Sequence, residues 1–244
     1  MAAKFRLTRR AALAGGVAGL SVSALGKRGS AQTPKKGGTL VFLQGQEPNS
    51  LVSLATTATP SLTNGCKVSE GLLEYDYDIN PRPQLATEWK ISPDGKEYVF
   101  KLRPNVKFHD GHPFTSADVA YSIMTMKQVH PRGRNTFANV TEVATPDPLT
   151  AVFVLSQPAP YLIKALAGCE SAIVPKHIYE GTDPVTNPNG NAPIGTGPYK
   201  FKEWVRGSHV TYVRNPDYWD PGLPRIDQMI CKFIRDAGAR SIAF

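Results

Sequence analysis

Residues 85–123 decide the fold, and they read LATEWKISPDGKEYVFKLRPNVKFHDGHPFTSADVAYSI. Within this stretch the spacing of apolar residues changes from two to three or four. Tyr98, Phe100 and Leu102 fall on one side of an extended chain, and Lys101 and Arg103 fall on the other. This alternation predicts a half-buried strand over residues 97–103.

A helix is predicted over residues 115–129. Thr115 suits the N-cap position, and Asp118 three residues later can accept a hydrogen bond from the Thr115 amide. The apolar residues that follow recur at spacings of three and four: Val119, Ile123, Met126 and Val129.

Between this strand and this helix, His109, Asp110 and His112 crowd into four residues. Three interpretations are open: a metal site, a catalytic corner or a turn. Asp110-Gly111 is a turn signal, and two histidines do not complete a zinc site, which needs at least a third ligand. No helical spacing brings in the remaining histidines, which are His130, His177 and His209. The turn is therefore the prediction, with no catalytic residue, no metal ligand and no cofactor.

The rest of the chain alternates between strand and helix signals. Strands are expected at 39–45, 72–78, 149–156 and 228–234, with a hairpin over 197–215 that turns at Arg206-Gly207-Ser208. A helix is expected to begin at Thr59-Pro60 and to run to about Leu72, and short helices are expected at 161–167 and 175–180. These elements predict a mixed α/β chain with much antiparallel sheet.

The formal net charge is +8, from 28 Lys and Arg against 20 Asp and Glu. A charge of this size suggests a nucleic acid or an anionic membrane as partner. Six of the basic residues, however, precede Gln32 in a stretch without Asp or Glu, so the remainder is nearly neutral. The folded part lacks the basic stripe that a nucleic-acid partner requires.

The first 31 residues resemble an export signal. Arg9-Arg10 precede a weakly apolar run of Ala, Gly and Ser, and a small residue, Ala31, suits the cleavage position. The arginine pair resembles a twin-arginine signal. The run is too short and too rich in glycine for a transmembrane anchor, which needs about 20 apolar residues. A soluble periplasmic protein is expected.

Three ordered blocks carry a resemblance to a known family. They are EGLLEYD at residues 70–76, the block at 85–123, and PIGTGPYKFKEWVRGSHVTYVRNPDYW at 193–219. Together they resemble the family 5 extracellular solute-binding proteins, the receptors of peptide, nickel and related ABC importers. The resemblance extends from about Gly37 to the last residue.

This resemblance implies a periplasmic-binding-protein-like fold of type II, cluster C, in which two lobes close on a ligand. It divides the chain into an export signal (1–31), a first ligand-facing segment (32–69), an inserted small α/β domain (70–191) and a second ligand-facing segment (192–244). Relatives continue into a second lobe, which this sequence lacks. We therefore expect a truncated gene product or a partial sequence, in which residues 32–244 bind peptides weakly or not at all.

The resemblance also implies where a ligand binds. In peptide-binding members an extended segment before the first helix pairs with the ligand backbone as an added strand. Thr57, Ala58 and Thr59 occupy the equivalent positions, with Thr57 where some relatives carry an acidic residue. Peptides are the first expected ligand class, nickel or another small solute the alternative, and an ABC permease the expected partner of a monomer.

Two hypotheses of other functional classes stay open beside that of a binding protein. A secreted hydrolase would need an activated nucleophile or a metal-bound water, and the sequence carries neither a G-x-S-x-G nor an H-E-x-x-H motif. A stand-alone interaction module derived from half a receptor is the other reading. The three cysteines, Cys66, Cys169 and Cys231, are too few for a disulfide framework.

Overall fold

The structure is a computed structural model that describes residues 35–166 and 171–243. The predicted export-signal residues Arg9, Arg10 and Ala31 lie outside the described residues, as does Cys169. Within the described ranges, no helix has both the length and the apolar character needed to cross a bilayer.

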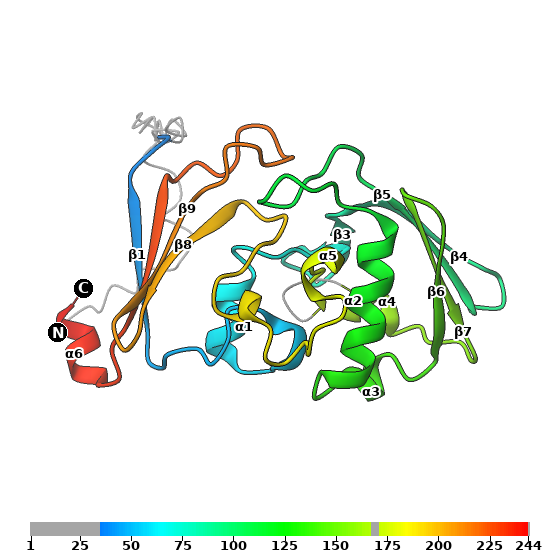
Figure 1. The fold of residues 1–244 in the computed structure, drawn as a ribbon, viewed down its shortest axis with the longest axis horizontal. Helices are drawn as coiled ribbons and strands as arrows, with labels where there is room; N and C mark the ends of the chain where they lie inside the picture. The colour runs from blue at the N-terminus through cyan, green and yellow to red at the C-terminus, as the bar shows by residue number, and fades with distance from the viewer. Residues whose placement is uncertain (1–34, 167–170, 244) are drawn as a thin grey trace, which may run out of the picture. The chain divides into compact units, whose positions relative to one another are not determined.

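One four-stranded sheet joins the two ends of the described chain (Figure 1). Its strand order is β1 (Thr39–Gln44), β10 (Gln228–Phe233), β9 (His209–Arg214) and β8 (Tyr199–Val205). β1 pairs in parallel with β10, and the other neighbours are antiparallel. The predicted strands and hairpin are confirmed, and Gly207 takes the positive φ of 72° that the turn requires.

A second four-stranded sheet is antiparallel throughout, in the order β4 (Ala86–Ile91), β5 (Glu97–Leu102), β7 (Thr150–Leu155) and β6 (Val140–Asp147). The predicted strands at β5 and β7 and the helix α2 (Ser116–Val129) are confirmed. Sequence analysis missed β4 and β6. In β4 most side chains are exposed, which hides the alternation, and the TPD at the end of β6 resembles a turn although it is extended.

Shorter elements lie outside the two four-stranded sheets. They are η1 (Ser53–Ala55), α1 (Thr59–Gly65), β2 (Leu73–Tyr75), β3 (Pro81–Pro83), α3 (Gly133–Thr136), α4 (Leu162–Ala165), α5 (Lys176–Tyr179), η3 (Pro188–Gly190) and α6 (Ala237–Ile242). The expected extension of the first helix to about Leu72 is wrong, because α1 ends at Gly65. The chain turns there, and the Val68 carbonyl accepts a hydrogen bond from Gly197 N at 2.8 Å instead of continuing the helix.

Two apolar clusters form the core. The larger lies between α2 and the sheet of β4–β7, where the rings of Phe100 and Phe153 meet edge to face at 5.2 Å and Ile123 and Met126 are fully buried. The smaller cluster packs on the sheet of β1 and β8–β10: Leu51, Val68, Tyr199, Val210, Tyr212 and Met229. The proposed boundaries of the ligand-facing segments and the insert stay a prediction.

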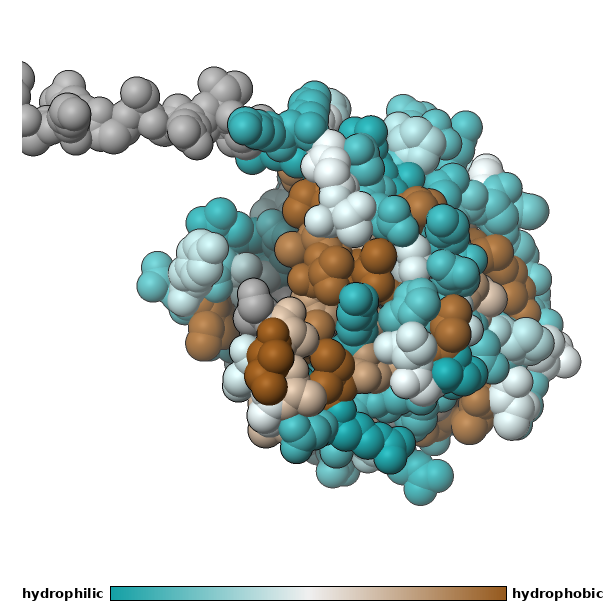
Figure 2. Space-filling model, turned by 90° about the vertical axis from the view of Figure 1, so that its left-hand side faces the viewer, coloured by the Kyte–Doolittle hydropathy of each residue, from teal (hydrophilic) through white to brown (hydrophobic). Residues whose placement is uncertain are grey.

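β1 is an edge strand, and its side chains are poorly covered. Leu40 is 40 % exposed and Val41 is 45 % exposed. Figure 2, which looks onto the side that carries β1 in Figure 1, shows hydrophobic residues gathered there among polar ones. An uncovered apolar edge of this kind is a site where another strand can pair.

Candidate ligand-binding site

The predicted ligand-binding residues lie between η1 and the start of α1. Thr56 has φ −144° and ψ 148°, and Ala58 has φ −64° and ψ 121°, so the backbone around Thr57 is extended. Thr57 and Ala58 are half-buried and Thr59 is exposed. Thr59 is the first helical residue and Ala58 the N-cap, one position earlier than the sequence analysis expected.

The backbone of Thr57 is unoccupied by the rest of the described chain. Neither its N–H nor its C=O has a hydrogen-bond partner among residues 35–166 and 171–243. Ala58 differs, because its N–H donates to Thr56 Oγ1 at 3.2 Å and its carbonyl accepts from Ser61 N at 2.9 Å. An extended residue with both main-chain groups open is what an added ligand strand needs.

A set of side-chain hydrogen bonds holds this segment in place. Asn49 Oδ1 accepts from Ser61 Oγ at 2.8 Å and from Thr56 Oγ1 at 3.4 Å. The residues before the segment are therefore tied to the first turn of α1, and the free backbone at Thr57 is positioned from both sides.

A buried polar network fixes α1 against the sheet. Asn64 is fully buried, its Nδ2 donates to Gln44 Oε1 at 2.8 Å, and its Oδ1 accepts from the Tyr212 hydroxyl at 2.9 Å. Cys231 Sγ also donates to Gln44 Oε1, at 3.3 Å, and burial raises the pKa of this thiol to about 11. The network joins α1 to β1, β9 and β10, so the helix that follows Thr57 is fixed to three of the four strands.

One hollow borders this segment at Thr56, and a second lies beyond the end of β1. One, of about 110 Å³, is lined in part by Asn49, Thr56 and Tyr179. The other, of about 470 Å³, lies beyond the end of β1, where four of the described residues border it: Gly45, Gln46, Glu47 and Arg235. The first is smaller than the roughly 300–1,000 Å³ of sites that enclose a drug-sized ligand, and the second has a wall on one side.

Glu47 forms the fixed part of that wall. Its carboxylate accepts hydrogen bonds from Trp204 Nε1 at 2.9 Å and from Gly207 N at 3.0 Å. The Arg206 guanidinium lies 3.3 Å from the centre of the Trp204 ring. These contacts tie the β8–β9 turn to the chain that follows β1 and hold Glu47 in place.

The predicted turn at Asp110-Gly111 is confirmed. Gly111 has φ +94°, its N–H donates to Phe108 O at 2.9 Å, and Phe108 N donates to His112 O at 2.8 Å. The capping box is also present, since Thr115 N donates to Asp118 Oδ2 at 2.9 Å.

His109 is half-buried and is held by the GTGPY motif. Its ring Nε2 lies 2.9 Å from Gly197 O, and its backbone N–H donates to Gly195 O at 2.9 Å. Burial lowers the pKa of His109 to about 4, so the imidazole is neutral at neutral pH. A neutral ring that donates to a carbonyl has a structural task, namely joining the second motif to the third.

The sequence analysis expected the remaining histidines to lie away from the Asp110 turn, and for His177 this is wrong. The structure brings His177 of α5 to the Asp110 turn, although its spacing in the sequence gave no reason to expect this. His177 Nε2 lies 2.7 Å from Asp110 Oδ2, and its ring stacks on His112 with centroids 3.9 Å apart. Asp110 and His177 are 67 positions apart, and this distance is closed by tertiary packing that no local pattern reveals.

Glu70 is a buried carboxylate that sequence analysis did not single out. It is 3 % exposed and accepts hydrogen bonds from Thr196 Oγ1 at 2.8 Å, Tyr218 OH at 2.7 Å and Trp219 Nε1 at 3.0 Å. Burial raises its pKa to about 7, and the three donors act in the opposite direction. The signal was present in the sequence, because Glu70 opens the first motif and all three donors lie in the last.

Comparisons with known proteins show which family this chain belongs to. The sequence profile described as "Bacterial extracellular solute-binding proteins, family 5 Middle" matches residues 80–244, which are more than half of the chain. The chain belongs to this family. The expected family and the mixed α/β fold of these binding proteins are thereby confirmed.

Individual family 5 proteins are similar over most of the chain. The oligopeptide-binding protein AppA of Bacillus subtilis is 33 % identical over 218 residues, which are 86 % of this chain and 39 % of AppA. The structure of AppA in complex with a nonapeptide matches this chain with a TM-score of 0.80 at 32 % identity. The match covers 86 % of this chain and 42 % of that chain.

A second similar structure is that of NikZ from Campylobacter jejuni in complex with Ni(L-His). Its TM-score is 0.75 at 29 % identity, and the match covers 84 % of this chain and 41 % of that chain. The chain thus spans less than half of the length of the family 5 proteins that it matches.

Proposed function

We propose that this chain contributes the substrate-binding component of an ABC importer, with peptides as its ligand class. Membership of family 5 supports a binding protein, and AppA is named as an oligopeptide-binding protein. The observation that carries the peptide assignment is the extended backbone at Thr57, whose N–H and C=O have no partner in the described chain.

In this proposal a peptide lies along Thr57, Ala58 and Thr59 as an added strand. Main-chain hydrogen bonds read the peptide backbone and not its side chains, so one segment accepts many sequences. Thr57 offers no charge to a cationic ligand group, which favours this backbone-directed mode over an ion pair.

The small size of one hollow and the openness of the other support weak binding by the chain alone. A site that encloses a ligand covers most of its surface, and the hollow next to Glu47 is open on one side. We therefore propose that residues 32–244 alone bind peptides weakly, and that tight binding needs a second wall.

The proposal is tested with a matched pair of substitutions at one position. Thr57→Pro removes the amide proton that the ligand would use, and no hydrogen bond within the described chain is lost with it. Thr57→Ala keeps the amide and changes the side chain only. Amide chemical shifts are followed while a mixture of short peptides is added up to millimolar concentration.

In the unsubstituted chain we expect the amides of residues 57–59 to shift. The shifts should persist in Thr57→Ala and be lost in Thr57→Pro, with the melting temperature of each variant as the control for folding. Shifts confined to other residues would show that this segment is not the ligand site. Equal binding by both variants would show that the Thr57 amide is not used.

We further propose that the chain is exported to the periplasm by the twin-arginine route and delivers its ligand to a membrane permease as a monomer without enzymatic activity. Replacing Arg9-Arg10 by Lys-Lys keeps the charge and changes the paired guanidinium groups. We expect this change to stop export, measured as the fraction of protein in the periplasm. Unchanged export would exclude the twin-arginine route.

A further inference from the structure

Asp110, His112 and His177 bring three potential metal ligands to one exposed place. One ligand atom from each residue lies within 4.8 Å of the other two. Two of the residues belong to the Asp110 turn and the third to α5, which begins 66 positions later at Lys176. This group is the only one of its kind that the described part of the chain contains.

The Asp110 carboxylate lies between the two imidazoles. Its Oδ2 is 2.7 Å from His177 Nε2, and its Oδ1 is 3.4 Å from His112 Nδ1. The two rings are stacked at 3.9 Å with an angle of 23° between their planes. One imidazole nitrogen from each ring thus faces the same carboxylate.

The backbone that carries these side chains is well fixed. Asp110 Oδ1 accepts from His112 N at 3.1 Å, which orients the carboxylate within the turn. The start of α5 is held by Lys176 N, which donates to Asp118 Oδ1 at 2.9 Å. The ring of Phe108 lies against His177 with centroids 5.9 Å apart. Metal sites need such support, because loosely held ligands do not keep a binding geometry.

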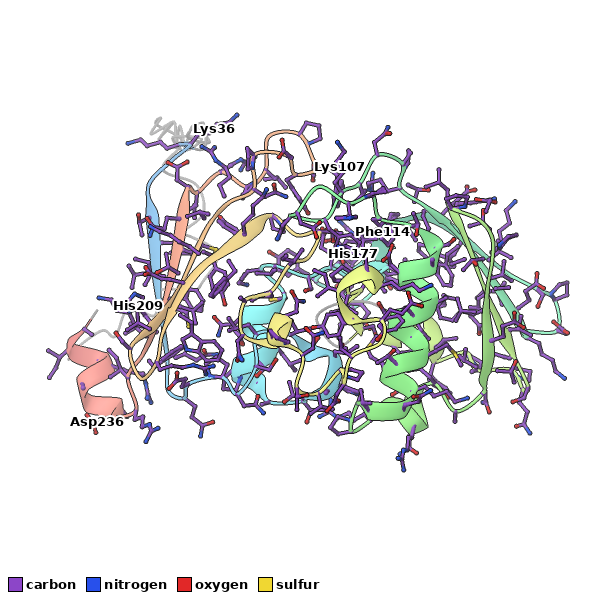
Figure 3. All side chains as sticks on the ribbon, viewed as in Figure 1. Lys36, Lys107, Phe114, His177, His209 and Asp236 are labelled. Carbon is purple, nitrogen blue, oxygen red and sulfur yellow. The ribbon has the colours of Figure 1, made fainter. Side chains whose placement is uncertain are left out.

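Positive charges lie near the three residues: Lys107 and Lys200 border the hollow next to Asp110 and weaken its attraction for a cation. Lys176, the basic residue next to His177, is paired with Glu180 at 3.3 Å. Figure 3 shows His177 close to Phe114 and the start of α2. His112 and His177 have side-chain exposures of 60 % and 31 %, so an ion can reach both from solvent.

We propose that Asp110, His112 and His177 bind a divalent transition-metal ion of the nickel, copper and zinc class. Imidazole nitrogen favours these ions over Mg²⁺ and Ca²⁺, which prefer oxygen ligands. Two histidines and one carboxylate on one side of the ion leave coordination positions open for water or for a small chelating ligand. The site is separate from Thr57–Thr59 and does not depend on the proposed peptide function.

The competing explanation is that Asp110 and His177 form an ion pair whose only task is to hold α5. This explanation predicts that metal ions bind with no preference for these residues. The two explanations therefore differ in the effect on metal binding of removing the His112 imidazole: an Asp110–His177 pair that only holds α5 gives His112 no role in binding a metal, although the His112 ring stacks on His177.

The test is calorimetric titration of the untagged full chain with Ni²⁺ and, separately, Zn²⁺ in a buffer that does not chelate metals. We expect one equivalent to bind with micromolar affinity. His112→Gln and His177→Gln should each weaken binding by about tenfold or more. Asp110→Asn, which keeps an acceptor for His112 N and removes the negative charge, should also weaken it.

His209→Gln is the matched control. His209 also lies beside a carboxylate, with Nε2 3.9 Å from Glu203 Oε1, but it is on β9 and far from His177 in Figure 3. This variant should bind as the unsubstituted chain does. Binding by both the His112 and the His177 variants that is as tight as in the unsubstituted chain, or binding no tighter than about 1 mM in the unsubstituted chain, would overturn the proposal.

A second measurement covers the case that His177→Gln disturbs α5. The electron paramagnetic resonance spectrum of the Cu²⁺-loaded chain should show hyperfine coupling to two imidazole nitrogens, and to one after His112→Gln. A spectrum without nitrogen coupling, or one that His112→Gln leaves unchanged, would contradict the proposed ligands.

Discussion

The Tyr218 hydroxyl donates a 2.7 Å hydrogen bond to Glu70 Oε1, although the two residues are 148 positions apart in the sequence. Trp219 and Thr196 donate to the same carboxylate. The Arg103 guanidinium lies 3.9 Å from the centre of the Trp219 ring and adds a positive charge to the group. One buried acid therefore joins the EGLLEYD motif, the long strand–turn–helix block and the NPDYW end of the last motif.

Measured near pH 5, Glu70→Gln should lower the free energy of unfolding by about 2–4 kcal/mol, because the amide carries two N–H donors where the protonated acid carries one O–H, and the groups around it are themselves donors. Urea denaturation measures the loss. Glu74→Gln is the control, since Glu74 is exposed on the neighbouring strand β2, and it should change stability by about 0.5 kcal/mol or less. Equal effects of the two substitutions would mean that the buried hydrogen bonds contribute little.

The pH dependence of stability should carry a contribution from Glu70. Its pKa is raised from 4.5 to about 7 in the folded protein, so the folded state holds a proton that the unfolded state has released. This contribution is complete below pH 4.5 and is lost as the pH rises through about 7, with a total on the order of 3 kcal/mol. The difference in the free energy of unfolding between the unsubstituted chain and Glu70→Gln should therefore shrink as the pH is raised from 4.5 to about 7. A difference that stays constant would contradict the raised pKa.

His109 should act in the opposite direction. Its pKa is lowered from 6.5 to about 4 by burial, so the unfolded state takes up a proton before the folded state does. Stability should fall as the pH falls from 6.5 towards 4, and His109→Gln should remove this part of the pH profile. Chemical denaturation at several pH values measures it. His209→Gln, at a partly exposed histidine, is the comparison, and an unchanged profile in His109→Gln would show that His109 is not the residue responsible.

Gly197→Ala should destabilise the protein strongly. A Cβ at this position would lie 2.6 Å from the Val68 carbonyl oxygen, which is part of the backbone and cannot move aside without breaking its hydrogen bond to Gly197 N. We expect a loss of about 3 kcal/mol or more, seen as a lower urea midpoint. Gly111→Ala is the matched control: its Cβ would meet nothing within 4 Å, so only the positive φ of 94° is strained, at about 1 kcal/mol. The prediction fails if the two variants are equally stable.

The sequence predicted those elements whose signal is local. The alternation at β5, the three-to-four spacing in α2 and the capping box at Thr115 are each contained within one element, and each is confirmed. β4 was missed because most of its side chains are exposed, so its burial does not alternate. Mixed exposure removes the periodicity on which the prediction of a strand depends.

Contacts between distant residues could not be predicted in the same way. The approach of His177 to Asp110 and that of Tyr218 to Glu70 depend on how whole elements pack, and no spacing in the chain encodes them. The segment Thr57–Thr59 was placed through its resemblance to the family, and its role in ligand binding stays a prediction. What the structure adds is the open backbone at Thr57.

The parallel pairing of β1 with β10 has a consequence for the time course of synthesis. Thr39 lies beside Gln228, and the chain between them is 189 positions long. A ribosome adds about 5–20 residues per second, so β1 waits roughly 10–40 s for its neighbour to be made. The sheet of β4–β7 draws on residues 86–155 only and can form during this interval, while the main-chain groups of β1 still lack their β10 partners. The nascent chain therefore has a defined period in which a chaperone can recognise its first strand, and that period ends when β10 emerges.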